Sequence, residues 1–248
     1  MKEHIYTIPV NDGFSEGGEC PFCNMFDILE KESIEYILGP AYMTDTIRLE
    51  TDKVGFCEKH IAQMHEKQNS LGLALMLYTH LQKINSDLDR EINSLYSQKS
   101  KKRILGKNRK TGNSVSSYLN NITNSCFVCN RINNTFDRYT DTFFYMWKSD
   151  PQMKEIVKNS RGFCLKHFSL IIEKGETALS SDEYNDFLKT VFSLQKENMK
   201  RLEDEVEWFI NKFDYRYKDE PWKTSKDALP RAVKKINSVD TKGNQYND

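Results

Sequence analysis

One pattern of cysteine and histidine occurs twice in the sequence, and it restricts the possible fold more than any other feature. The first copy is Cys20-Pro21-Phe22-Cys23 followed by Gly55-Phe56-Cys57-Glu58-Lys59-His60. The second copy is Cys126-Phe127-Val128-Cys129 followed by Gly162-Phe163-Cys164-Leu165-Lys166-His167. The spacings are C-x2-C-x33-C-x2-H and C-x2-C-x34-C-x2-H, offset by 106 to 107 residues. The pattern indicates an internal duplication in which each half supplies three thiols and one imidazole.

These residue types are the ligands of a tetrahedral metal site. All 6 cysteines lie in the pattern, with two of the 5 histidines. Zn²⁺ favours four Cys and His ligands, and a site that the protein fills completely has no position for a reactive water. We therefore predict two structural Zn²⁺ sites and no catalytic residues. A role other than catalysis is favoured, and a metalloenzyme stays open as an alternative. The predicted ligands are Cys20, Cys23, Cys57 and His60 in one site, and Cys126, Cys129, Cys164 and His167 in the other. Exchange of the two Cys-x-x-Cys pairs between the halves would satisfy the same ligand count.

Other uses of the thiols fit the sequence less well. Disulfide frameworks are typical of small secreted chains, whereas this chain has 248 residues and begins without the apolar core of a signal peptide. We therefore expect a reducing, cytoplasmic location. Covalent haem needs a histidine directly after Cys-x-x-Cys, where Asn24 and Asn130 stand. An iron–sulfur cluster held by three cysteines and one histidine stays open as an alternative, because the ligand count does not distinguish it from zinc.

The spacing of apolar residues predicts an all-α fold. Apolar residues recur every three or four positions from Ile61 to Tyr96 and from Tyr184 to Phe213, as in long amphipathic helices. Ser180 and Glu183 fit a capping box at the start of the second one. Shorter helices are predicted for residues 25–38 and 132–147, and after Asp150-Pro151. We expect the duplicated halves to pack as one compact unit, with the aromatic residues 143–147 buried between them.

Composition divides the chain into four segments. Residues 1–98 and 125–218 are the two metal-binding halves, residues 99–124 are predicted to be a basic flexible linker, and residues 219–248 a short helix with a disordered tail. Residues 99–110 carry seven positive charges and no acidic residue. Nucleic acid is a weakly supported partner for this stretch, since the chain has no recognisable reader fold and its 36 basic residues balance 36 acidic ones. The long helices favour a protein partner or a second copy of the chain instead.

No membrane association is expected. The longest apolar stretch, residues 71–77, is far too short to cross a bilayer.

Several segments resemble an uncharacterised bacterial family, a domain of unknown function. They are Ile5-Tyr6-Thr7-Ile8-Pro9-Val10-Asn11, Cys20-Pro21-Phe22-Cys23, Met43-Thr44-Asp45-Thr46-Ile47-Arg48, Glu220-Pro221-Trp222 and Lys226-Asp227-Ala228-Leu229-Pro230-Arg231-Ala232. Some members of that family carry an automatic label as ABC transporter substrate-binding proteins. The resemblance covers nearly the whole chain and implies no established activity.

Three functions follow from the sequence. The first is a zinc-stabilised helical scaffold or interaction protein, favoured by the closed ligand sets. The second is a thiol-based redox or metal sensor, in which oxidation of thiolates releases Zn²⁺ and loosens the helices. The third is a metalloenzyme with an iron–sulfur cluster or an open metal position.

Overall fold

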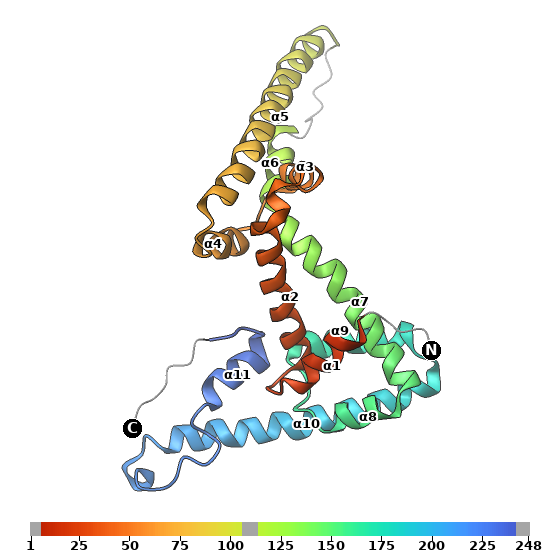
Figure 1. Cartoon of the computed structure of the whole chain (residues 1–248), viewed down its shortest axis with the longest axis vertical. Coiled ribbons are helices and arrows are strands. Elements are labelled where there is room, and N and C mark those ends of the chain that lie inside the picture. Colours follow the sequence, from red (N-terminus) through yellow and green to blue (C-terminus); the bar gives the residue numbers. More distant parts are fainter. Residues whose placement is uncertain (1–5, 106–113, 242–248) are drawn as a thin grey trace. The chain divides into compact units, whose positions relative to one another are not determined.

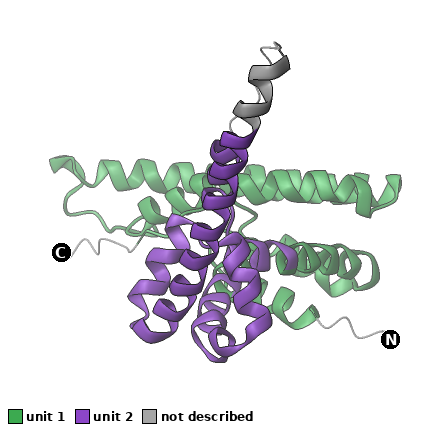
Figure 2. Ribbon diagram, turned by 90° about the horizontal axis from the view of Figure 1, so that it is seen from above, with its two compact units in different colours: residues 1–28, 135–248 green, residues 29–134 purple. Residues whose placement is uncertain are grey.

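A computed structural model describes residues 6–105 and 114–241, and of residues 98–105 the backbone only. These residues form helices and no strand, which confirms the predicted all-α class (Figure 1). Contacts divide the chain into two compact units, a finer division than the single unit expected. Unit 1 comprises residues 1–28 and 135–248, and unit 2 comprises residues 29–134 (Figure 2). The units therefore do not coincide with the two halves of the sequence pattern.

Two helices run from one unit into the other. Helix α2 (Pro21–Leu38) begins in unit 1 and ends in unit 2. Helix α7 (Phe127–Ser149) begins in unit 2 and ends in unit 1. Each of them begins inside a Cys-x-x-Cys motif, so one predicted ligand directly precedes each helix and a second lies in its first turn.

Unit 1 contains most of the helices after α7. Its other elements are α1 (Thr7–Ser15), α8 (Pro151–Lys158), α9 (Leu165–Ala178), α10 (Ser181–Asn211), the 3-10 helix η2 (Tyr215–Tyr217) and α11 (Ala228–Asn237). The capping box of Ser180 and Glu183 is present at the start of α10. Asp150 caps α8 by accepting a hydrogen bond from the backbone N–H of Gln152. The signals that start these two helices were thus interpreted correctly.

Aromatic side chains form the core of unit 1. Phe143 lies against Phe14 and Phe22 from the first sequence half and against Phe187 from the second, at ring-centroid distances of 5.9, 5.3 and 6.2 Å. Its neighbours Phe144, Met146 and Trp147 are also buried. The predicted burial of this run is confirmed for these four residues, whereas Tyr145 is exposed.

Unit 2 contains the helices between α2 and α7. They are the 3-10 helix η1 (Pro40–Met43), α3 (Asp45–Val54), α4 (Glu58–Glu66), α5 (Ser70–Leu105) and α6 (Ser114–Thr123). The single helix predicted from residue 61 to 96 is wrong, because the chain breaks between α4 and α5. Gln68 has a φ of 60° there, and the side chain of Asn69 accepts a hydrogen bond from Gly72 N at 2.9 Å. That bond satisfies a free N–H at the start of α5.

Parts of the predicted flexible linker are helical. Helix α5 continues to Leu105 and α6 begins at Ser114, so of residues 99–124 only 124 and the undescribed 106–113 lie outside these two helices. The short C-terminal helix is present as α11, and most of the predicted tail, residues 242–248, lies outside the described residues. Among the described helices, none is long and apolar enough to span a membrane.

Candidate metal centres

The structure gathers the eight predicted ligands into two clusters. Site 1, in unit 1, consists of Cys20, Cys23, Cys164 and His167. Site 2, in unit 2, consists of Cys57, His60, Cys126 and Cys129. In each cluster the four ligand atoms lie within 4.8 Å of one another. The eight residues do meet as sets of three cysteines and one histidine, but the predicted pairing is wrong: each Cys-x-x-Cys meets the Cys-x-x-His of the other half.

Helix lengths explain this exchange of partners. Helix α2 has 18 residues, which carry the chain about 27 Å away from the first Cys-x-x-Cys. The following α3 has 10 residues and covers only about 15 Å. The second half repeats the mismatch, with 23 residues in α7 and 8 in α8. In each half the helix that follows the long one is too short to return the chain to its starting point. The Cys-x-x-His therefore lies away from the Cys-x-x-Cys of the same half.

Each site lies at the N-termini of two helices. Cys57 and Cys164 are the residues just before α4 and α9, with extended backbone (ψ of 165° and 160°). His60 and His167 follow in the first turn, on the same side as the cysteine. The other two sulfurs of each site come from the start of α2 or α7. Because the N-terminus of a helix is its positive end, both pairs of helices favour thiolate over thiol.

A glycine two residues before each Cys-x-x-His permits the turn into the site. Gly55 and Gly162 have φ values of 63° and 75°, which residues with a Cβ rarely adopt. A Cβ at Gly55 would lie 2.6 Å from Nε2 of His80, and one at Gly162 would lie 2.8 Å from Oε1 of Gln195. The glycine of the repeated Gly-Phe-Cys motif is therefore required by the backbone conformation.

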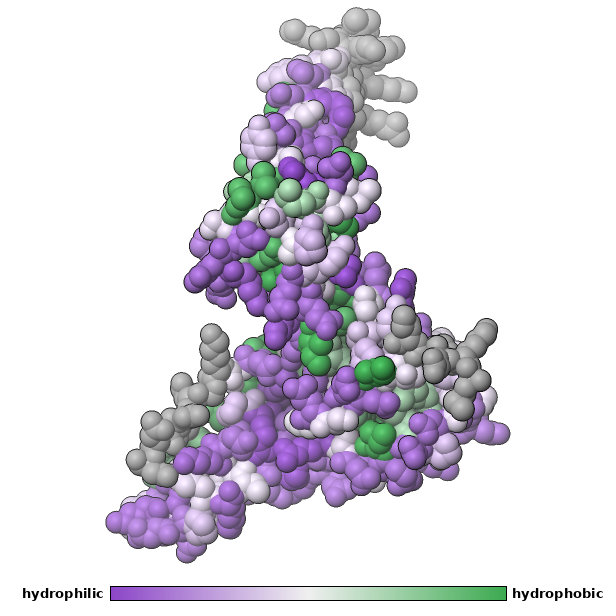
Figure 3. All heavy atoms as spheres, viewed as in Figure 1, coloured by the Kyte–Doolittle hydropathy of each residue, from purple (hydrophilic) through white to green (hydrophobic). Residues whose placement is uncertain are grey.

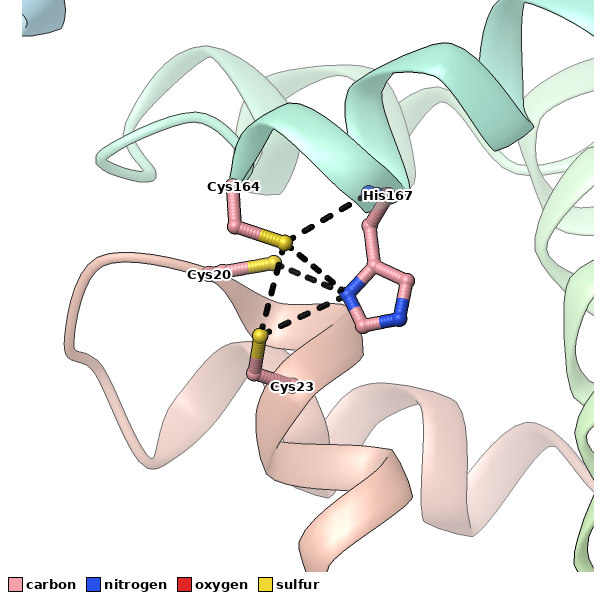
Figure 4. Close-up of side chains that lie close together, drawn as sticks. All are labelled: Cys20, Cys23, Cys164 and His167. Carbon is pink, nitrogen blue, oxygen red and sulfur yellow. Dashed lines mark hydrogen bonds between the residues drawn. The ribbon is translucent and has the colours of Figure 1, made fainter. Parts of the chain in front are cut away.

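In site 1 the three sulfurs converge on one ring nitrogen, as Figure 4 shows. Nδ1 of His167 lies 3.5 Å from the sulfur of Cys20, 3.4 Å from Cys23 and 3.2 Å from Cys164. The sulfurs of Cys23 and Cys164 are 3.5 Å apart. All four residues are buried, with at most 3% of each exposed.

Site 2 has the same arrangement but is more open. Nδ1 of His60 lies 3.3 Å from each of the sulfurs of Cys57, Cys126 and Cys129. The sulfurs of Cys57 and Cys129 are 3.8 Å apart. Cys126 and His60 are buried, whereas Cys57 and Cys129 are partly exposed.

These distances match the edges of a metal-centred tetrahedron. With Zn–S near 2.3 Å and Zn–N near 2.05 Å, ligand sulfurs lie about 3.8 Å apart and sulfur and nitrogen about 3.6 Å apart. The observed separations of 3.2 to 3.8 Å lie close to both values. A disulfide would require about 2.05 Å, and all six cysteines are free. The donor atoms therefore fit a single four-coordinate ion in each site.

Protonation of the clusters also points to a cation. In site 1, hydrogen bonds from neighbouring thiols lower the pKa of Cys164, while burial raises the pKa of Cys20 to about 12. In site 2, burial alone would raise the pKa of Cys126, but the hydrogen bond with His60 lowers it to about 6. Burial raises the pKa of Cys129 to about 12. Each cluster thus favours one thiolate and disfavours further ones, and three thiolates need a bound cation.

A carboxylate supports the histidine of site 2. Oε1 of Glu30 lies 3.1 Å from Nε2 of His60, on the side of the ring away from the sulfurs. Burial alone would raise the pKa of Glu30, but hydrogen bonds with His60, Lys59 and Gln63 lower it to about 2. A carboxylate on the far nitrogen of a ligating histidine fixes the ring and increases its basicity. The sequence offered no signal for Glu30, which lies outside both motifs.

Direct hydrogen bonds hold the two chain segments of site 2 together. The N–H of Phe127 donates to the carbonyl oxygen of Gly55 at 2.9 Å, and the hydroxyl of Ser125 donates to that of Val54 at 2.6 Å. In site 1 the residue corresponding to Phe127 is Pro21, which has no N–H to donate.

Helix α11 provides the corresponding link in site 1. The ammonium of Lys235, which is fully buried, donates to the carbonyl oxygens of Glu19 and Arg161. These two residues precede the two ligand segments of the site. The hydroxyl of Ser238 also lies 3.0 Å from the sulfur of Cys164. From the sequence alone, Lys235 belongs to the short C-terminal helix and has no role in a site.

Comparison with known proteins identifies a family and no characterised relative. The model of one family, described as a family of unknown function (DUF6062), matches residues 1–243. No curated protein and no solved structure matches the chain.

Proposed function

The chain belongs to the DUF6062 family, and we propose that it is a zinc-binding helical protein whose two Cys₃His sites are structural. One observation carries the proposal: eight donor atoms form two groups of four, each with the dimensions of a tetrahedral site. Three thiolates and one imidazole fill such a site, so no position is left for a water or a substrate. This closed set favours a structural metal over a catalytic one.

The size of the clusters favours zinc over an iron–sulfur cluster. An iron–sulfur cluster occupies the space between its ligands and binds them through two or more iron atoms. Here the four ligand atoms of each site lie within 4.8 Å of one another, which suits one ion in contact with all of them. Among single ions, Zn²⁺ has the strongest preference for tetrahedral thiolate and imidazole ligands. Reduced thiols at both sites also favour a cytoplasmic location.

The proposed role of the zinc-stabilised helices is to bind another protein. The visible surface is mainly hydrophilic, with small groups of apolar side chains (Figure 3). Helix α5 exposes Leu71, Tyr78 and Leu81 by 66%, 60% and 56%. These three residues are seven and three positions apart, which places them on one face of the helix, as in helices that bind other helices. The partner would be a protein or a second copy of this chain.

Metal analysis of a matched pair of histidine variants tests the proposal. Native mass spectrometry of protein purified under reducing conditions should show two zinc ions per chain. His60→Asn should leave one zinc, because it removes a ligand of site 2. His65→Asn alters an exposed histidine on the same helix and should leave two. Two tightly bound ions in His60→Asn, or iron with sulfide in the unaltered protein, would contradict the proposal.

A further inference from the structure

We propose that site 2 responds to peroxide: Cys57 and Cys129 form a disulfide that expels the zinc of this site, while site 1 keeps its zinc. The inference rests on the proposed zinc sites and adds a difference in function between them. It is based on the unequal access to two sites with the same ligands.

The two sites differ in which sulfurs an oxidant can reach. In site 1, Cys20 and Cys164 are fully buried and Cys23 is 3% exposed. In site 2, only Cys126 is buried among the sulfurs, and Cys57 and Cys129 are partly exposed. Oxidation of cysteine depends on thiolate character and on exposure. Bound zinc would make all six sulfurs thiolates, so exposure is the property that separates the sites.

The two exposed sulfurs also lie close enough to join. They lie 3.8 Å apart, and a disulfide requires them to approach to about 2.05 Å. Cys57 precedes α4 and Cys129 lies in the first turn of α7, so the movement involves two helix ends rather than the centre of a helix. In site 1, the sulfurs of Cys23 and Cys164 are closer still, at 3.5 Å. The distance between the sulfurs therefore does not favour a disulfide in site 2 over one in site 1. The access of the oxidant to the sulfurs does favour site 2.

The reaction takes place in two steps with hydrogen peroxide as the oxidant. In the first, the thiolate of one exposed cysteine attacks an oxygen of the peroxide, the O–O bond breaks, and a sulfenic acid and hydroxide form. In the second, the other thiolate attacks the sulfenic sulfur, the S–S bond forms and a second hydroxide leaves. The two sulfurs together lose two electrons, and these reduce the peroxide to two hydroxides. Zinc then retains only Cys126 and His60 as ligands and dissociates.

Loss of this zinc should loosen one region of unit 2. The hydrogen bonds from Ser125 to Val54 and from Phe127 to Gly55 join the two ligand segments beside the metal. These bonds between short loop segments depend on the metal to hold the segments in place. Oxidation should therefore increase hydrogen exchange in residues 55–66 and 124–134. Residues 159–172, which contain the ligands of site 1, should stay protected.

The test is peroxide titration of the zinc-loaded full chain, with released zinc measured by a chromogenic chelator. We expect one of two zinc ions to be released first, with the loss of two hydrogens in the intact mass and a Cys57–Cys129 disulfide in the peptide map. Simultaneous release of both ions, or a first disulfide between Cys23 and Cys164, would overturn the inference. Protein without two zinc ions before the titration would instead overturn the proposed function, so the two failures are distinguishable.

A variant separates the disulfide from other damage. Cys129→His keeps four zinc ligands in site 2, as two cysteines and two histidines, and removes one member of the thiol pair. Provided it binds two zinc ions, we expect it to lose the rapid release. Rapid release that persists in this variant would show that the Cys57–Cys129 bond is not the cause. If the variant binds only one ion, the disulfide map of the unaltered protein decides.

Discussion

The ammonium of Lys235 donates a hydrogen bond to the carbonyl oxygen of Glu19, 3.0 Å away, on the residue just before Cys20. A second bond to the carbonyl oxygen of Arg161 connects the same ammonium to the segment that leads to Cys164. Burial lowers the pKa of Lys235, and the carboxylate of Glu19, 3.7 Å away, opposes this effect. A side chain from the C-terminal helix therefore connects the two segments that bring cysteines to site 1.

Replacing Lys235 by methionine should destabilise unit 1 and weaken metal retention at site 1. Methionine fills a similar volume but leaves the buried carbonyl oxygen of Glu19 and the partly buried one of Arg161 without this donor. A buried acceptor that loses its donor costs about 1 to 3 kcal/mol. Urea denaturation would give the loss of stability, and competition with a chelator would give the faster loss of zinc. Lys234→Met is the control, since its ammonium pairs with the exposed carboxylates of Asp27 and Asp240. Equal effects of the two variants would show that the link is unimportant.

Removing the carboxylate of Glu30 should weaken zinc binding at site 2 only. Loss of a carboxylate behind a ligating histidine typically reduces metal affinity by about 10- to 100-fold. We expect Glu30→Ala to show this reduction for one of the two zinc ions in a chelator competition. Glu35→Ala, on the same helix, removes an exposed carboxylate that pairs with Lys67 and should leave both affinities unchanged. A loss spread over both sites would contradict the assignment.

Zinc binding at site 2 should release a proton from His60 near neutral pH. Burial alone would lower the pKa of His60, but hydrogen bonds with Cys126 and Glu30 raise it to about 9 in the metal-free protein. Its charged form therefore stabilises the metal-free fold below pH 6.5, and this contribution is lost as pH rises through about 9. Since zinc needs Nδ1 unprotonated, affinity at site 2 should rise with pH between 7 and 9.

Calorimetry in buffers of different ionisation enthalpy measures these protons directly. Glu30→Ala should lower the pKa of His60 and so reduce the number of protons released at pH 7.5. An unchanged number in this variant would show that Glu30 does not control the protonation of His60.

Cutting the chain between residues 109 and 110 should give fragments that assemble through zinc. Each fragment carries four of the eight ligands, and these are two from site 1 and two from site 2. We expect light scattering to show a one-to-one complex with two zinc ions, weakened by a chelator. Fragments that each bind one zinc tightly and remain separate would show that the ligands pair within the halves instead.

The eight ligand residues could be predicted from the sequence, but the pairing of each Cys-x-x-Cys with a Cys-x-x-His could not. Residue type and spacing identify a tetrahedral set, and this depends only on local chemistry. Which Cys-x-x-Cys meets which Cys-x-x-His depends on how far α2 and α7 carry the chain, and the repeated motif contains no information on that distance. Glu30 and Lys235 lie outside the motifs, and only the folded structure brings them to His60 and Cys20.

A helix could be predicted where the spacing of apolar residues agreed with a capping signal, as for α10, which begins at the capping box of Ser180 and Glu183. The break between α4 and α5 was missed because apolar residues continue at helical spacing through it. The signal that was present is Asn69, whose side chain takes the place of a backbone acceptor at the start of α5. A polar residue that caps a helix outweighs periodicity at such a position.

The exchanged pairing also determines when each site can close during synthesis. Cys57 and Cys129 are 72 residues apart in the sequence, and Cys23 and Cys164 are 141 residues apart. The segment between the first two lies inside the segment between the second two. Cys20 and Cys23 leave the ribosome first, yet they are the last thiols to gain their partners. Site 2 can form as soon as α7 has begun, while the chain that will complete unit 1 is still being made. Cys20 and Cys23, which are buried in the folded protein, are thus the thiols exposed longest in the nascent chain.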